Sequence, residues 1–173
     1  MNKSLPRVLI SREQIAHRVD KLGRQITADF QGEEIVILCI LNGAFVFCSD
    51  LIKKIQLPLK VEFISLSSYG SGTDSKEEVI CEWDCKLSLR DRNVVIVEDI
   101  VDSGLTIKYL LQMIHSRGAK SVKVAALLFK PSRNRYPVSI DYLGFEIPDQ
   151  FVVGHGLDHA QKYRELPYIG IIE

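Results

Sequence analysis

Residues 94–106 read VVIVEDIVDSGLT, and this stretch decides the fold. Its first four residues are all β-branched, which is typical of a short strand buried on both faces of a parallel sheet. Two adjacent carboxylates follow the strand, and a polar turn at 102–104 then leads into an apolar pattern that predicts a helix over 105–115. A buried strand, a polar turn and a helix in this order predict one unit of an α/β fold.

The same alternation of strand and helix patterns runs through the rest of the chain. A capping box, SREQ at 11–14, predicts the start of a helix with one apolar face, and Gly32 is predicted to end it. A second helix is predicted at 45–55, and further strands are predicted at 35–41, 61–66, 79–83, 122–129, 141–144, 151–153 and 168–172. We therefore predict an α/β fold with a mostly parallel twisted sheet flanked by helices, built as a single domain over residues 1–173.

Composition excludes several classes of protein. The 173 residues carry 22 basic and 22 acidic side chains, and a formal net charge of zero argues against a strongly basic nucleic-acid binder. No apolar run approaches the roughly 18 residues that span a bilayer, and the first residues, MNKSLPR, lack the apolar stretch of a signal peptide. We therefore expect a cytoplasmic protein that contacts neither membrane nor nucleic acid.

The cysteines and histidines give weak metal signals. The four cysteines, at 39, 48, 81 and 85, have no CxxC pairing, so we expect no zinc site and no disulfide. His155 and His159 are four residues apart but lack the glutamate of an HExxH motif. Cys39 lies inside an apolar run and is expected to be a small buried hydrophobic residue.

The turn after residues 94–97 has the composition of an anion-binding loop. Gly104 allows the backbone to approach a phosphate closely, Ser103 and Thr106 add hydroxyl donors, and the helix that begins there contributes its positive end. The carboxylates of Glu98 and Asp99 would repel a bare phosphate, but a ribose 5-phosphate places hydroxyls against them, and Mg²⁺ can bridge them to further phosphates. The alternative is a strand end with solvated acids, in which Asp102 only caps the helix.

Residues 95–106 resemble the phosphoribosyl diphosphate (PRPP) motif of type I phosphoribosyltransferases: apolar residues, two acids, a short apolar spacer and Asp-[Ser/Thr]-Gly-x-Thr. The sequence LSSY at 66–69 is similar to the start of the mobile catalytic loop of hypoxanthine-guanine phosphoribosyltransferases. LLFK at 127–130, the segment 144–158 and YRELP at 163–167 are similar to other signatures of that family. The resemblance covers about residues 11–173, and it implies a small hood formed by the terminal segments.

The resemblance implies roles for the residues around PRPP. Glu98 and Asp99 would hold the ribose hydroxyls, directly or through Mg²⁺, and Asp158 would help to hold a second Mg²⁺. Arg164 would contact pyrophosphate. The 5-phosphate would be bound by the backbone amides and hydroxyls of Ser103, Gly104, Leu105 and Thr106.

It also implies roles at the purine. Asp102 would act at purine N7 as the general base or as a stabilising carboxylate, and Lys130 would donate to the 6-oxo group. Phe151 would stack on the purine while the backbone of Val152 reads its edge. Each residue also has a simpler explanation: Lys130 as an exposed strand-end lysine, Phe151 as a core aromatic residue, and Arg164 as a surface charge. A loop over 67–78, with Ser68 and Tyr69 at its start, would close to exclude water.

One turn departs from the family pattern. The family usually has Leu-Lys-Gly-[Gly/Ala/Ser] in its pyrophosphate loop, with a strained and often cis peptide, whereas residues 41–44 here read LNGA. Asn42 replaces the lysine, which removes a positive charge. Pyrophosphate would then be bound by the backbone amides of Gly43 and Ala44.

The resemblance implies an enzyme of purine salvage. Such an enzyme transfers 5-phosphoribosyl from PRPP to N9 of hypoxanthine or guanine in the presence of Mg²⁺, giving IMP or GMP and pyrophosphate, and is expected to be a homodimer or homotetramer. Three alternatives remain open: a sister transferase for xanthine or orotate, a regulatory protein that keeps the fold and binds nucleic acid, and a nucleotide-binding module without turnover.

Overall fold

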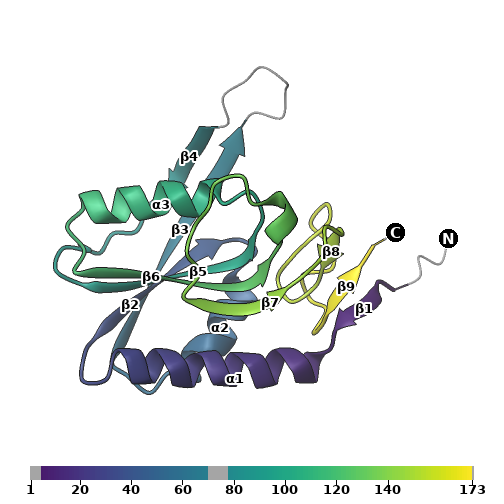
Figure 1. Ribbon diagram of the computed structural model, residues 1–173, viewed down its shortest axis with the longest axis horizontal. Helices are drawn as coiled ribbons and strands as arrows, with labels where there is room; N and C mark the ends of the chain where they lie inside the picture. The colour runs from purple at the N-terminus through teal and green to yellow at the C-terminus, as the bar shows by residue number, and fades with distance from the viewer. Residues whose placement is uncertain (1–4, 70–77, 173) are drawn as a thin grey trace.

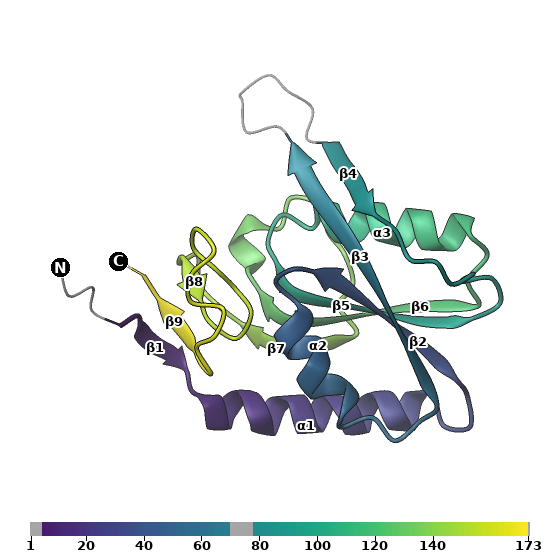
Figure 2. The same ribbon diagram turned by 180° about the vertical axis from the view of Figure 1, so that it is seen from behind.

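The computed structural model describes residues 5–69 and 78–172. Within these ranges, a six-stranded sheet in the order β4-β3-β2-β5-β6-β7 forms the centre of the molecule (Figures 1 and 2). Neighbouring strands are parallel except for the β3–β4 hairpin, which is antiparallel. The strands are β2 Ile35–Leu41, β3 Leu59–Tyr69, β4 Glu78–Trp83, β5 Asn93–Val101, β6 Ser121–Phe129 and β7 Tyr142–Glu146. The predicted α/β class with a mostly parallel sheet is confirmed.

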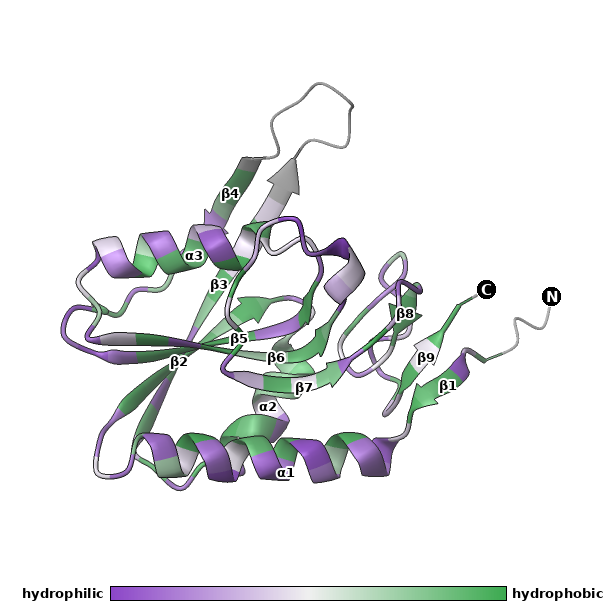
Figure 3. Cartoon of the chain, in the orientation of Figure 1, coloured by the Kyte–Doolittle hydropathy of each residue, from purple (hydrophilic) through white to green (hydrophobic). Residues whose placement is uncertain are grey.

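Helices cover both faces of this sheet. Helices α1 (Arg12–Asp29) and α2 (Phe45–Ile52) lie on one face, and α3 (Leu105–Ser116) lies on the other (Figure 1). The side chains of β2 alternate between two apolar clusters, so that Ile37 packs with α1 and α2 while Leu38 packs with α3. This double burial explains why the central strands are mostly hydrophobic whereas α1 alternates between hydrophobic and hydrophilic residues (Figure 3).

The first and last strands form a second, smaller sheet. It has the order β1-β9-β8 and is antiparallel, with β1 at Arg7–Ile10, β8 at Val152–Val153 and β9 at Ile169–Ile171. Residues of β8 and β9 belong to the same apolar cluster as those of α1, so the small sheet packs against the main body. This sheet is the hood that we expected from the terminal segments.

Several element bounds differ from the predictions. Strand β5 runs to Val101, because residues after the acidic pair continue the ladder with β6, up to Val101 opposite Phe129. Helix α1 ends at Asp29, before Gly32, and α2 ends at Ile52. Strand β1 and a short 3-10 helix, η1 (Pro131–Arg133), were not predicted. In the described ranges, none of the helices has the length and apolar character needed to cross a bilayer.

Candidate active site

The polar turn after β5 lines a pocket of about 330 Å³ at the carboxyl end of the sheet. Gly104 has φ of 85°, and a Cβ atom there would lie 2.2 Å from the backbone oxygen of Tyr136, so this position requires glycine. The amide of Leu105 donates to Ser103 Oγ at 3.3 Å as α3 begins. The predicted 5-phosphate residues therefore meet at a helix N-terminus. The pocket is lined by Glu98, Ile100, Val101, Asp102, Ser103, Gly104, Thr106, Ile107, Arg133 and Arg135.

Glu98 is buried and lines this pocket, and Asp99 beside it is half-buried. The amide of Asp99 donates to Glu98 Oε1 at 3.2 Å, and the amide of Ile100 donates to Asp99 Oδ1 at 2.8 Å. Burial raises the pKa of Glu98 well above its usual range, and the adjacent charge of Asp99 raises it further. Burial also raises the pKa of Asp99. A nearby cation or hydroxyl donor would stabilise the charged form of these carboxylates. Mg²⁺ supplies such a cation, and ribose supplies such hydroxyl donors.

This burial predicts a pH-dependent gain of stability in Glu98→Gln. Because the pKa of Glu98 is higher in the folded than in the unfolded state, its contribution to stability is present below about pH 4 and is lost as pH rises through the folded-state pKa. We therefore expect the variant's Tm to exceed that of wild type at pH 8 by more than at pH 5. Each pKa unit of upward shift corresponds to about 1.4 kcal/mol. Thermal unfolding across this pH range measures the difference.

Glu13→Gln is the control for this prediction. A hydrogen bond from Ser11 lowers the pKa of Glu13, so its contribution is present at neutral pH and is lost as pH falls. Between pH 5 and pH 8, the Tm difference between Glu13→Gln and wild type should therefore stay nearly constant, whereas that of Glu98→Gln should grow with pH. A Tm difference for Glu98→Gln that stays constant with pH would contradict the buried, destabilised carboxylate.

The predicted pyrophosphate loop lies directly against the acidic pair. A Cβ atom on Gly43 would fall 1.7 Å from Asp99 Oδ2, and one on Gly156 would fall 2.2 Å from the backbone oxygen of Gly43. The peptide between Leu41 and Asn42 is cis, as expected from the resemblance. The Ala44 amide, predicted to bind pyrophosphate, donates here to the backbone oxygen of Ile40 at 3.3 Å.

Arg164 reaches this loop from the carboxyl-terminal segment. Its Nη1 donates to the backbone oxygen of Gly156 at 2.7 Å, and its Nη2 lies 2.8 Å from Asp158 Oδ1. The structure thus brings Gly43, Asp99, Asp158 and Arg164 together. Among residues 5–69 and 78–172, no three carboxylate, thiol or imidazole side chains are grouped closely enough to hold a metal alone. The carboxylates of Asp99 and Asp158 fit Mg²⁺, which binds one or two protein carboxylates and completes its coordination shell with substrate phosphates and water.

Asp102 and Lys130 directly follow the neighbouring strands β5 and β6, at the same edge of the sheet. Lys130 is only 6% exposed, and its Nζ lies 3.5 Å from Asp149 Oδ1. Asp102 Oδ1 lies 3.0 Å from Arg133 Nε. The alternative of Lys130 as an exposed strand-end lysine is wrong, since a lysine is rarely buried to this degree unless it is paired.

Phe151 directly precedes β8, the strand of the hood that begins at Val152. Phe151 is 55% exposed and makes an edge-on contact with His159 at 5.3 Å between ring centroids. The alternative of Phe151 as a core residue is therefore wrong. Val152 is buried in β8, opposite Ile171 of β9. An exposed aromatic face next to an ordered backbone edge is suited to stacking on a planar base.

Three other predicted residues are placed less fully. The backbones of Ser68 and Tyr69 complete β3, opposite Val79 and Glu78 of β4, while residues 70–77 of the predicted catalytic loop lie outside the described residues. Asn42 is exposed in the turn after β2.

The sequence analysis missed Arg133 and Arg135, which line the pocket. The basic turn KPSRNR at 130–135 was the available signal, since it follows a strand that ends at the same sheet edge.

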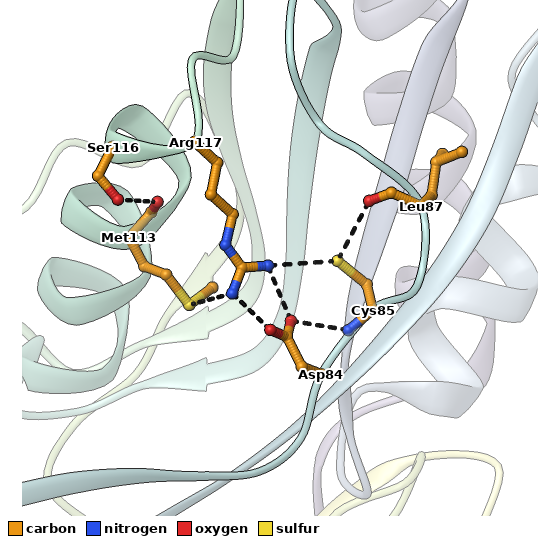
Figure 4. A network of polar contacts seen from close by, with 6 residues as sticks. All are labelled: Asp84, Cys85, Leu87, Met113, Ser116 and Arg117. Carbon is orange, nitrogen blue, oxygen red and sulfur yellow. Dashed lines mark hydrogen bonds and ion pairs between the residues drawn. The ribbon is translucent and has the colours of Figure 1, made fainter.

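A polar network ties the β3–β4 hairpin to the far end of α3 (Figure 4). The guanidinium of Arg117 binds both carboxylate oxygens of Asp84, with Nη1 2.9 Å from Oδ1, and Nη1 also lies 3.7 Å from Cys85 Sγ. Burial raises the pKa of the Cys85 thiol. All four cysteines, Cys39, Cys48, Cys81 and Cys85, are free thiols in the structure.

Comparison with known proteins places this geometry in a family. Residues 10–160 match the model of the phosphoribosyl transferase domain, so the chain belongs to the phosphoribosyltransferase family. It is 44% identical over 173 residues to hypoxanthine-guanine phosphoribosyltransferase of Bacillus subtilis, covering 100% of this chain and 96% of that protein. The resemblance drawn from residues 95–106 is confirmed.

A solved structure and a longer relative complete the comparison. The crystal structure of a hypoxanthine-guanine phosphoribosyltransferase from Bacillus anthracis superposes with a TM-score of 0.94 at 42% identity, covering 98% of this chain and 100% of that one. The bifunctional protein TilS/HprT of Listeria innocua is 44% identical over 173 residues, and this chain spans 27% of its length.

Proposed function

We propose that the chain is a Mg²⁺-dependent hypoxanthine-guanine phosphoribosyltransferase of purine salvage. The observation that carries this proposal is the order of groups along one sheet edge. A pocket of about 330 Å³ at the N-terminus of α3 is lined by the buried carboxylate of Glu98 and by Asp102, and buried Lys130 follows the neighbouring strand β6. These groups match, in order, the phosphate, the ribose hydroxyls and the acceptor oxygen of a base in a nucleoside 5-phosphate. The names of the Bacillus relatives support the same activity.

Binding of PRPP follows from this arrangement. The 5-phosphate accepts from the amides and hydroxyls of residues 103–106, and the positive end of α3 favours its charge. Glu98 and Asp99 accept from the two ribose hydroxyls. The pyrophosphate group lies near Gly43 and Arg164, whose guanidinium donates to Gly156 beside that loop. Asp99 and Asp158 would hold Mg²⁺, which would supply charge neutralisation for the pyrophosphate leaving group.

The base is held on the other side of the anomeric carbon. Phe151 stacks on the purine ring, the Val152 backbone reads its edge, and Lys130 donates to the 6-oxo oxygen. Asp102 accepts the N7 proton as N9 attacks the anomeric carbon and the bond to pyrophosphate breaks. The carboxylates near the anomeric carbon stabilise the positive charge that develops there.

A spectrophotometric assay tests the proposal. The full chain is incubated with PRPP and Mg²⁺, and hypoxanthine, guanine, xanthine and adenine are compared as acceptors. We expect IMP and GMP from the first two bases, no product without PRPP, and loss of turnover with excess EDTA. Formation of no nucleotide from any base would overturn the enzyme proposal, and formation of XMP alone would favour a xanthine transferase.

Lys130→Met is expected to relax the choice between 6-oxopurines and 6-aminopurines. The variant keeps the length of the buried stem but removes the donor that pairs with the 6-oxo oxygen. We expect kcat/KM for hypoxanthine to fall by about 10²-fold or more, as is typical when one partner of a buried hydrogen bond to a charged group is lost. The ratio of hypoxanthine to adenine turnover measures the effect. An unchanged ratio would contradict the role of Lys130.

The remaining expectations concern assembly and location. We propose a homodimer or homotetramer, supported by a groove of about 790 Å³ that contains half-exposed Phe45 and buried His155. Nε2 of His155 has no hydrogen-bond partner among the described residues, and burial lowers its pKa. Light scattering on a size-exclusion column measures the assembly, and a monomer at micromolar concentration would contradict it.

We further propose one domain over residues 1–173, because the hood and the main sheet share an apolar cluster. A cytoplasmic location is supported by the four free thiols. The zero net charge supports partners that are small molecules, with neither nucleic acid nor membrane among them.

A further inference from the structure

Four charged side chains of alternating sign form a row along the purine side of the pocket. Asp102 Oδ1 lies 3.0 Å from Arg133 Nε, Arg133 Nη1 lies 3.4 Å from Asp149 Oδ1, and this oxygen lies 3.5 Å from Lys130 Nζ. The two ends of the row are the groups assigned above to purine N7 and to the 6-oxo oxygen. In the structure, both groups are therefore paired with protein charges.

Arg133 is the cation of this row that lines the proposed 5-phosphate pocket, and Asp102 lines the same pocket. It is the last residue of η1 (Pro131–Arg133), and its side chain is 49% exposed, which leaves the guanidinium room to turn. Arg133 is therefore within reach of two anions, the carboxylate of Asp102 and a phosphate in the pocket.

The contact between Arg133 and Asp102 is poorly aligned. Oδ1 of Asp102 is shielded from solvent, yet in the described part of the chain it has no partner that meets hydrogen-bond geometry. The pair at 3.0 Å is thus a charge contact without an aligned N–H donor. A phosphate offers more charge and three acceptor oxygens, and a guanidinium binds phosphate oxygens in a two-pronged geometry. The phosphate is the better partner for Arg133.

We propose that Arg133 is a phosphate-binding residue that releases the purine site when PRPP binds. In the free protein, Arg133 pairs with Asp102 and Asp149. A 5-phosphate in the pocket draws the guanidinium away, which frees Asp102 for N7. Asp149 loses one of its two cations in the same movement. Phosphate and purine therefore bind with positive coupling through this one side chain. The inference rests on the proposed function, because it assigns the two ligands to the same site.

The test measures binding of hypoxanthine with and without ribose 5-phosphate, which carries the phosphate but lacks the pyrophosphate leaving group. For wild type we expect ribose 5-phosphate to tighten the Kd of hypoxanthine about 5- to 100-fold, the usual range of coupling between two sites. For Arg133→Met we expect hypoxanthine to bind more tightly without ribose 5-phosphate than it binds to wild type. Ribose 5-phosphate should then lower the variant's Kd for hypoxanthine by less than about 2-fold, because the coupling is reciprocal and the Arg133 guanidinium that links the two sites has been removed.

Two further variants separate this effect from a general loss of charge. Arg133→Lys keeps the charge without the planar guanidinium and is expected to retain part of the coupling. Arg90→Met removes the same charge from an exposed arginine that pairs with neighbouring Asp91, and it should keep wild-type coupling. Circular dichroism and Tm of each variant show whether the fold is kept.

The outcomes distinguish this inference from the proposed function. If wild type binds neither ligand, the proposed function fails. If wild type shows coupling and Arg133→Met keeps it within 2-fold of the wild-type value, the switch role of Arg133 is wrong while the enzyme proposal stands. Weaker binding of hypoxanthine to Arg133→Met in the absence of ribose 5-phosphate would also overturn the inference, because Arg133 would then support the purine site directly.

Discussion

Asp102→Asn is expected to lower kcat by about 10²- to 10⁴-fold, the usual contribution of a general base. The amide has the same shape as the carboxylate but does not accept the N7 proton. The KM for PRPP should change little, because the 5-phosphate is held by residues 103–106. Steady-state kinetics with hypoxanthine as the varied acceptor measure the loss.

Asp20→Asn is the matched control for this variant. Asp20 is exposed to a similar degree as Asp102, 37% against 40% of the side chain, and it also pairs with one arginine, Arg24, at 2.8 Å. It lies on α1, on the face of the sheet away from α3. We expect Asp20→Asn to keep normal turnover. Near-normal turnover in Asp102→Asn would remove the general base from the mechanism.

Gly43→Ala is the second substitution with a large expected effect. The new methyl group would fall 1.7 Å from Oδ2 and 2.6 Å from Cγ of Asp99, so either the loop or the carboxylate must move. Overpacking of this kind typically costs about 1–3 kcal/mol of stability. Since both partners contact PRPP in the proposed mechanism, kcat/KM for PRPP should fall by at least about 10-fold, or about 1.4 kcal/mol in the barrier. Tm and kcat/KM are the two measurements.

A double-mutant cycle shows whether this steric cause is correct. Asp99→Ala removes the carboxylate, so adding Gly43→Ala to it should cost little further stability. A double variant that loses as much Tm as the sum of the two single variants would show that the loop itself, independent of Asp99, does not tolerate a Cβ atom.

The elements with strong local signals were predictable from the sequence. Strand β2 was predicted with the bounds that the structure shows, because residues 35–41 are apolar throughout and are buried on both faces. The capping box of Ser11 and Gln14 fixed the start of α1. The pocket at the start of α3 is lined by the glycine and hydroxyl residues from which a phosphate site was predicted.

The parts that depend on distant partners were not predictable. Strand β1 has only four residues, and its pairing with β9 joins Arg7 to Ile171 at the other end of the chain. Strand β5 is longer than its apolar run, because β6 supplies ladder partners for residues that a local pattern assigns to a turn. Hydrophobic periodicity reports local burial and carries no information on which strand lies alongside.

The same limit applies to the candidate site. The resemblance supplied Lys130, Phe151 and Arg164, but their partners came from the structure. Arg133 and Asp149 link two predicted purine contacts, and Asp158 is paired with Arg164. Such pairs form between segments that meet only after folding, so spacing along the chain does not report them.

The order β1-β9-β8 has a consequence for how the molecule opens. The backbone of Val152, which faces the base in the proposed mechanism, is held by β9, and β9 is held in turn by β1. Because β8 has 2 residues and β9 has 3, the small sheet offers fewer ladder bonds to hold this backbone than the six-stranded sheet offers to its own strands. Brief separation of β1 from β9 would loosen the backbone at Val152, while the six-stranded sheet and the pocket at the start of α3 stay intact. Amide hydrogens of β8 and β9 should accordingly exchange with solvent faster than those of β2 and β5. The part of the site proposed to bind the base would then open locally, independently of the central sheet.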